Sequence, residues 1–195
     1  MEPARAWEVA LVPVGNLSEW DQTRPPDPGA WTWDGPAILP ARGVYVVWLW
    51  LPGGRQLPVP PPQGLWLPAG LYAYAGSAQR ALPARLSRHL AGGKVRHWHV
   101  DALRAEAQVV GADVWPGAPR EAECQVADLL AASSPGTFRP PRFGASDCGC
   151  PGHLIGWDAT GDGVAAYRAP QAVHPELRAV IRIEAPPWHE RRSTR

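Results

Sequence analysis

The chain has 195 residues, 45% of them hydrophobic, and carries a formal net charge of +1. This length and composition predict one globular core and exclude an intrinsically disordered chain. The three cysteines are too few for a disulfide framework. The N-terminus lacks the layout of a signal peptide, and no apolar run is long enough to cross a bilayer. We therefore expect a cytoplasmic protein with no membrane partner.

Composition divides the chain into three segments. Residues 1–40 are rich in Pro, Trp and acidic residues, and we interpret them as an N-terminal extension that its tryptophans pack on the domain. Residues 41–160 hold the periodic elements and predict the folded domain. Residues 161–195 predict a C-terminal extension that ends in a basic tail.

Three strands are predicted at the start of the domain. The run GVYVVWLWL at 43–51 is apolar on both alternating faces, as in a central strand covered on both sides. Residues 55–59 predict a short edge strand, because Pro58 cannot donate to a central ladder. Residues 70–76 predict the third strand. The short connections indicate an antiparallel meander, and hence an α+β fold with a small antiparallel sheet flanked by helices.

A helix is predicted over residues 81–90, and its apolar stripe consists of Leu82, Leu86 and Leu90. At about 100° per residue, Arg85 and His89 fall together beside that stripe, one turn apart. Arg88 points away from it. The helix therefore presents one arginine and one histidine along the edge of its buried face.

The later elements follow the same reasoning. We predict helices at 97–105 and 118–132, strands at 107–115, 163–169 and 176–185, and a compact Gly-rich segment at 143–159 that ends in a strand. In the helix at 118–132, Glu123 lies at the edge of the apolar stripe, whereas Glu121 and Asp128 point to solvent. A half-buried carboxylate is costly unless it is paired, which makes Glu123 a candidate site residue.

Phosphodiester hydrolysis needs a deprotonated water, a neutralised phosphoryl group and a stabilised leaving oxygen. The sequence offers a group for each task. Tyr45 or His89 can help to deprotonate water, and Arg85 suits the phosphoryl charge. A carboxylate such as Glu123 can hold Mg²⁺ or Mn²⁺, which stabilises the leaving oxygen, and Tyr74 lies on a strand of the same predicted sheet as Tyr45.

A locally basic segment runs from Arg80 to Arg104, and a phosphate backbone would be attracted to it, but charge alone favours a solvated helix face. For the cluster of His97, Trp98, His99 and Asp101 we favour a helix start in which Asp101 holds a neighbouring arginine over a phosphate-contacting or metal-proximal element. The residues that we expect to contact DNA are Gly76 and Ser77, through their backbone N–H groups, and Arg88, Lys94, Arg96, His97 and His99.

The triplets GVY at 43–45 and YAG at 74–76 resemble the two halves of the GIY-YIG nuclease signature. The run at 74–89, YAGSAQRALPARLSRH, resembles the strand, turn and helix that follow in that superfamily. The resemblance implies a metal-dependent DNA endonuclease, acting in DNA repair or processing and alongside a repair-protein partner. It implies no oligomeric state.

The same resemblance implies the roles of single residues. Tyr45 and Tyr74 match the signature tyrosines, Arg85 the arginine that stabilises transition-state charge, and His89 a histidine near the scissile phosphate. Glu123 matches the glutamate that holds the metal. A core role for the two tyrosines remains the alternative, as does a catalytically silent nucleic-acid-binding module.

A narrower resemblance is to a family of unassigned function within that superfamily, found alone or fused to endonuclease III. The shared patterns are YxYxGSA, RLxRH followed by HWHxD, EC in the helix at 118–132, and FGxSDCxCxxHL. They occur in order and cover roughly residues 43–157, which is more specific than any single motif. The chain departs from the signature in a longer, Pro-rich gap between its two halves.

Cys148, Cys150 and His153 form the last candidate group. Three interpretations stay open: a tight turn with small buried thiols, a zinc site to which Cys124 supplies the fourth ligand, and a nucleophilic cysteine beside His153. We rank them in that order. The zinc interpretation predicts a zinc-stabilised structural or interaction domain as a further alternative function.

Overall fold

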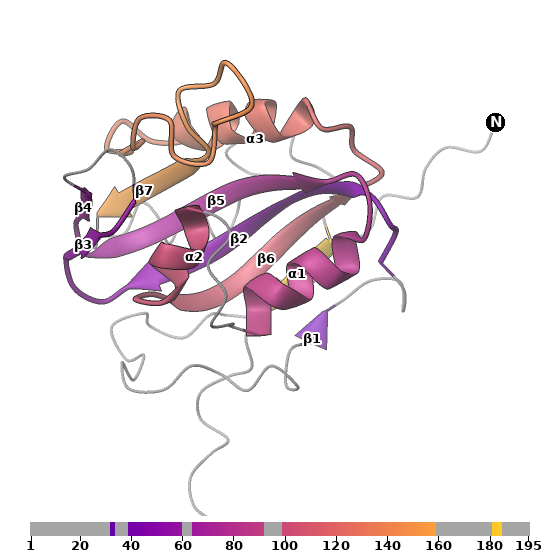
Figure 1. Ribbon diagram of the computed structural model, residues 1–195, viewed down its shortest axis with the longest axis horizontal. Helices are drawn as coiled ribbons and strands as arrows, with labels where there is room; N and C mark the ends of the chain where they lie inside the picture. The colour runs from indigo at the N-terminus through magenta and orange to yellow at the C-terminus, as the bar shows by residue number, and fades with distance from the viewer. Residues whose placement is uncertain (1–31, 34–38, 60–63, 92–98, 159–180, 185–195) are drawn as a thin grey trace, which may run out of the picture.

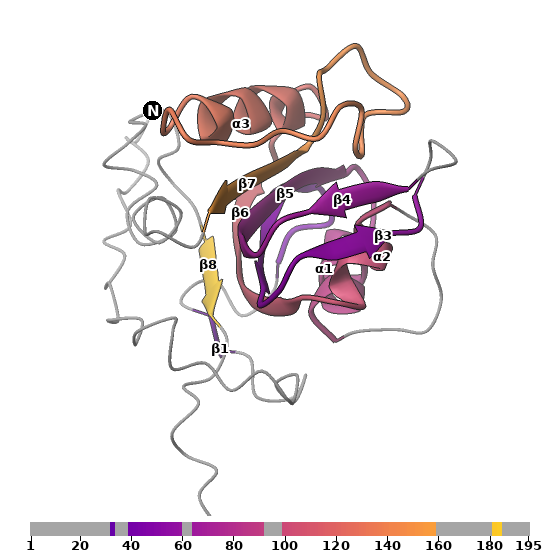
Figure 2. The same ribbon diagram turned by 90° about the vertical axis from the view of Figure 1, so that its left-hand side faces the viewer.

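The computed structural model describes residues 32–33, 39–59, 64–91, 99–158 and 181–184. They form a six-stranded antiparallel sheet with helices on both faces (Figures 1 and 2). The strand order is β1 (Thr32–Trp33), β8 (Ile181–Glu184), β6 (Gln108–Pro116), β2 (Gly43–Leu51), β5 (Gly70–Ala78) and β7 (Leu154–Asp158). The predicted α+β fold with an antiparallel sheet flanked by helices is confirmed.

The central strand β2 is buried on both faces, as its continuous apolar run predicts. Tyr45, Val47 and Leu49 face the core beneath α1 (Leu82–Ala91) and α2 (His99–Arg104). Val46 and Trp48 face the opposite core, beneath α3 (Ala122–Ala131). Each such side chain contributes about 1.5–3 kcal/mol when it leaves water, so the two cores hold the sheet from both sides.

The predicted meander is wrong, because β2 pairs directly with β5. These two strands are nine residues each and align end to end, from Gly43 opposite Ala78 to Leu51 opposite Gly70. The short strand β3 (Arg55–Leu57) instead pairs with β4 (Leu65–Leu67) in a separate two-stranded sheet. A three-residue strand that precedes a proline cannot fill the hydrogen-bonding edge of a nine-residue strand.

The predicted helices are confirmed: α1 is shifted by one residue, α2 covers the described part of the helix predicted at 97–105 up to Arg104, and α3 is shorter than the predicted 118–132. In α1, Leu82 and Leu86 are buried and Leu90 packs partly against the core. The strand predicted at 107–115 is β6. The strand predicted at 176–185 contains β8, which joins the main sheet together with β1. The strand predicted at 163–169 lies outside the described residues. No helix in the described part of the chain is long and apolar enough to cross a membrane.

Candidate functional site

A cavity of about 410 Å³ opens where β5 extends past its neighbour β7. Strand β7 pairs with β5 from Gly70 to Tyr74, and the N–H of Ala75 still donates to the carbonyl of His153 at 2.9 Å, so within the described residues only the last three residues of β5 lack a backbone partner on that edge. Side chains from both faces of the sheet can therefore meet there. All five residues predicted to carry the chemistry line the cavity: Tyr45, Tyr74, Arg85, His89 and Glu123.

The hydroxyl of Tyr45 shares a hydrogen bond with Nε2 of His89 at 3.0 Å. Both side chains are buried, at 2% and 1% exposure. Burial, helped by the positive charges of Arg88 and Arg104, lowers the pKa of His89 to about 3, while the carboxylate of Asp101 opposes that shift. Burial raises the pKa of Tyr45 to about 12, against the nearby charge of Arg85. Both partners are therefore neutral near pH 7.

Two glycines make room for the two tyrosine rings. A Cβ on Gly76, which lies opposite Tyr45 across the β2–β5 ladder, would stand 2.7 Å from that tyrosine's hydroxyl. A Cβ on Gly144 would stand 2.8 Å from the ring of Tyr74. Gly144 also has a φ of +72°, a conformation that favours glycine. The backbone at Gly76 therefore limits where the Tyr45 ring can move, and the backbone at Gly144 does the same for Tyr74. Burial also raises the pKa of Tyr74, so its phenol keeps its proton.

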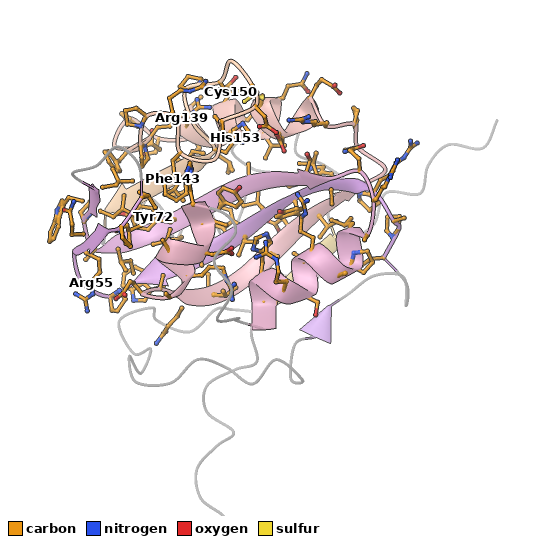
Figure 3. The ribbon with its side chains drawn as sticks, in the orientation of Figure 1. Arg55, Tyr72, Arg139, Phe143, Cys150 and His153 are labelled. Atoms are coloured by element: carbon orange, nitrogen blue, oxygen red, sulfur yellow. A yellow bond between two sulfur atoms is a disulfide. The ribbon has the colours of Figure 1, made fainter. Side chains whose placement is uncertain are left out.

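Tyr72, which Figure 3 labels, has the same parity on β5 as Tyr74, yet the two side chains make different contacts. Its hydroxyl donates a hydrogen bond to the carbonyl of Pro68 at 2.6 Å. Tyr74 lines the cavity and Tyr72 does not. The structure thus separates the two tyrosines that the sequence leaves on one face.

Arg85 is half-buried, and its guanidinium donates a hydrogen bond to the carbonyl of Ser77 at 2.8 Å. This bond spans from α1 to the end of β5, so the positive charge is held at the cavity wall. Gly76 and Ser77, whose backbone N–H groups are predicted to meet a phosphate, also line the cavity.

Glu123 enters the cavity from α3, on the other side of the sheet. The prediction that Glu123 rather than Glu121 faces inward is confirmed, because Glu123 is 7% exposed and Glu121 is exposed. One oxygen of Glu123, Oε1, lies 3.9 Å from Nδ1 of His153. A buried carboxylate beside a partly enclosed cavity with a largely polar lining suits a divalent cation, which takes one or two carboxylates and keeps several waters.

The basic residues predicted to contact DNA divide into three groups. Arg88 donates to both oxygens of Asp101 at 3.0 and 2.9 Å, which confirms that Asp101 holds a neighbouring arginine. Arg88 is therefore turned toward α2, away from the cavity. His99 lines the cavity, and its Nδ1 accepts the N–H of Gly144 at 3.4 Å. The remaining three lie outside the described residues: Lys94, Arg96 and His97.

The three cysteines and His153 lie close together beside the cavity; Figure 3 labels two of the four, Cys150 and His153. One ligand atom from each of Cys124, Cys148, Cys150 and His153 lies within 4.8 Å of the others. Cys148 and Cys150 lie in a run of turns and bends, as the turn interpretation expects, but all three cysteines are half-buried rather than buried. Cys124 and Cys150 are joined by a disulfide, and Cys148 is free. The sequence did not predict this disulfide. As a set of side chains, the group can bind a metal such as zinc.

Several lining residues were not predicted from the sequence: Gln79, Arg120, Gly144, Ser146 and Asp147. Arg120, just before α3, and Asp147, in the 143–153 loop, form an ion pair at the edge of the cavity. The FGxSDCxCxxHL pattern contains three of these residues, so the signal was present. Their place in the cavity depends on how the 143–153 loop folds back on α3, which the residue pattern does not specify.

A family model described as "Domain of unknown function DUF123" matches residues 44–171. This match covers well over half of the chain, so the chain belongs to that family. None of the curated proteins and none of the solved structures compared with the chain matches it.

Proposed function

We propose that this member of the DUF123 family is a metal-dependent endonuclease of the GIY-YIG type that hydrolyses phosphodiester bonds in DNA. The observation that carries the proposal is the meeting of five side chains in one cavity of about 410 Å³. They come from two strands and two helices on opposite faces of the sheet: Tyr45, Tyr74, Arg85, His89 and Glu123. These are the residues that the resemblance to the superfamily selects.

Arg85 and Tyr74 support the phosphate end of this chemistry. A phosphoryl group in the cavity would lie beside a guanidinium that is anchored on the carbonyl of Ser77. Because the site is partly enclosed, that charge acts through a lower dielectric than water and stabilises developing negative charge more strongly. The ring of Tyr74 would orient the same phosphoryl group, because the backbone at Gly144 lies against the ring and limits its movement.

The Tyr45–His89 pair supports the activation of water. His89 is neutral at pH 7 and can accept a proton, and the Tyr45 phenol stays protonated. A water in the cavity would give its proton to the Tyr45 oxygen as the phenol passes its own proton to Nε2 of His89 across the 3.0 Å hydrogen bond. A bound phosphate brings negative charge near the imidazole and raises its affinity for that proton.

Glu123 would hold the divalent metal, Mg²⁺ or Mn²⁺, whose chemistry is to stabilise the leaving oxygen. The fit rests on the burial of this carboxylate at the cavity wall, where an unpaired charge would be costly. We place the activity in cytoplasmic DNA repair or processing, with a repair-protein partner supplying the DNA target.

A catalytically silent nucleic-acid-binding module is the second candidate. The observation that favours it is the burial of His89, at 1% exposure, and Tyr45, at 2%, since a catalytic group must reach substrate. This candidate predicts salt-sensitive DNA affinity without cleavage.

A nicking assay on supercoiled, branched and damaged DNA, with Mg²⁺ or Mn²⁺, separates the two. We expect Arg85→Ala and Glu123→Gln each to lower the nicking rate by about 10²–10³-fold, as for loss of one preorganised electrostatic group. Arg80→Ala and Glu121→Gln are matched controls, because both residues are exposed on the same elements or next to them. Nicking that survives both cavity substitutions would mean that this cavity is not the catalytic site.

A further inference from the structure

The four-residue cluster of Cys124, Cys148, Cys150 and His153 supports an inference that does not depend on the nuclease proposal. Cys124 lies in the first turn of α3. Cys148 and Cys150 lie in the 143–153 loop, and His153 is the last residue of that loop, directly before β7. Two cysteines are enough for a disulfide. Nothing in the Cys124–Cys150 disulfide requires a third thiol and a buried imidazole at the same point.

The distances from His153 to two of the sulfurs match those of a tetrahedral zinc site, whereas Cys124 and Cys150 are bonded to each other. Nε2 of His153 lies 3.5 Å from Sγ of Cys148 and 3.6 Å from Sγ of Cys124. Zinc bonds to sulfur at about 2.3 Å and to imidazole nitrogen at about 2.0 Å, so tetrahedral geometry places these ligand atoms about 3.5 Å apart. Three thiolates and one imidazole are a common set of ligands in structural zinc sites.

We propose that in the reduced protein these four side chains bind one Zn²⁺, and that the Cys124–Cys150 disulfide is the oxidised form of the same cluster. A dithiol reductant supplies the two electrons and two protons that convert the disulfide to two thiols and becomes a disulfide itself. The three thiols release their protons to solvent as their thiolates bind the ion. The oxidised cluster has lost two of its four ligands and does not retain zinc.

The loop that carries the cluster is held in place without the metal. Arg142 donates to the carbonyls of Cys148 and Cys150 at 2.7 and 3.2 Å. The N–H of His153 donates to the carbonyl of Phe143 at 2.7 Å. The backbone therefore brings the ligands together before an ion binds, which reduces the entropy lost on binding.

The imidazole of His153 has a carboxylate on its other side. Its Nε2 faces the sulfurs and its Nδ1 faces Oε1 of Glu123 at 3.9 Å. Zinc-bound histidines commonly turn their second nitrogen to a carboxylate, which fixes the ring and raises its basicity. Glu123 thus connects the zinc site to the cavity, since it lines that cavity as well. Four protein ligands leave no open position on the metal, so the site is structural: it joins α3 to the loop.

The test uses the full chain, purified with a dithiol reductant and dialysed against metal-free buffer. We expect one zinc per chain by elemental analysis. We also expect Co²⁺ to give the visible bands of a tetrahedral thiolate complex and to protect all three thiols from an alkylating reagent. Cys148→Ser and His153→Ala should each lower zinc affinity by at least about tenfold, measured with a competing chelator. His99→Ala, a histidine of the same cavity wall, is the control and should keep full affinity.

A second pair of variants tests the outer carboxylate. Glu123→Gln should weaken zinc about 10–100-fold, and Glu121→Gln should not. Wild-type protein that is fully reduced, yet holds no zinc and gives no cobalt bands, would overturn the proposal whatever the variants do. Zinc retained with unchanged affinity in both Cys148→Ser and His153→Ala would also overturn it. Because the readout is metal content, it is separate from any result on DNA cleavage.

Discussion

Replacing Gly76 by alanine tests whether the Tyr45 ring is fixed as the site requires. The new Cβ would lie 2.7 Å from both the ζ carbon and the hydroxyl of Tyr45, and 3.0 Å from its ε2 carbon. Carbon atoms in contact normally lie about 3.5–4.0 Å apart, so the ring or the strand must move by close to 1 Å. The ring has little freedom to do so, because it is 2% exposed and its hydroxyl is bonded to His89.

Two costs follow from that displacement. Overpacking of a buried core costs about 1–3 kcal/mol. Loss of the Tyr45–His89 bond would add about 1 kcal/mol or more, because Nδ1 of His89 already has no partner in the described structure. We therefore expect Gly76→Ala to lower the free energy of unfolding by about 2–4 kcal/mol. A shift of about 1 Å at a reacting group should also reduce nicking by about 10²-fold.

Urea denaturation measures the first effect without reference to activity. Gly136→Ala is the matched control, because a Cβ there meets nothing within 4 Å. Gly76→Ala should also be tested in a Tyr45→Leu background, which lacks the clashing atoms. The added cost of Gly76→Ala should largely disappear in that background, giving a coupling energy of about 1–3 kcal/mol. Equal costs in both backgrounds would refute the view that Gly76 positions the Tyr45 ring.

Two further predictions concern residues outside the chemistry. Asp101→Asn should lower the free energy of unfolding, measured by urea denaturation, by about 3–5 kcal/mol, because it leaves the buried side chain of Arg104 and half-buried Arg88 without their carboxylate. Glu106→Gln is the control: it removes the carboxylate of an exposed pair and should change that free energy by less than about 0.5 kcal/mol. Similar costs for the two would show that the buried pair contributes no more than a surface one. Tyr72→Phe should lose about 1 kcal/mol with an unchanged nicking rate, since its hydroxyl bonds a backbone carbonyl away from the cavity. A drop in rate comparable to that of Tyr45→Phe would contradict the assignment of the two tyrosines.

Helical phase was the part of the site that the sequence predicted best. Periodicity of 3.6 residues put Arg85 and His89 on the buried edge of α1 and Glu123 rather than Glu121 on that of α3. Both outcomes are local, because the direction of a side chain on a helix depends only on its position relative to the apolar stripe. Arg88 shows the same rule, since it points away from the cavity and meets Asp101 on α2 instead.

Long-range pairing was the part that the sequence could not supply. The order of the strands depends on which long strands hydrogen-bond to one another. No local sequence pattern predicts that β6 pairs with β2, or that β3 and β4 pair in a separate two-stranded sheet. The rim pair of Arg120 and Asp147 joins residues 27 positions apart and has the same origin. The disulfide has the same origin, because Cys124 and Cys150 lie 26 positions apart and only the tertiary fold brings their sulfurs together.

Acid stability follows from the buried imidazole of His89. Its pKa is about 3 in the folded chain and 6.5 in the unfolded one, so between these pH values the unfolded chain binds the extra proton. Stability therefore falls as pH drops through that window. The loss is about 2 kcal/mol at pH 5 and about 4 kcal/mol at pH 3, where the folded chain also begins to take up the proton, at about 1.36 kcal/mol per pKa unit. His153, whose pKa is also lowered, acts in the same direction, so the contribution of His89 must be isolated.

His89→Gln stays neutral throughout, and unfolding free energies of both proteins between pH 7 and 5 give the difference. We expect the advantage of the wild type over the variant to shrink by about 2 kcal/mol across that range. A difference that does not change with pH would mean that His89 is solvated and free to charge, and the proton relay through Tyr45 would lose its basis.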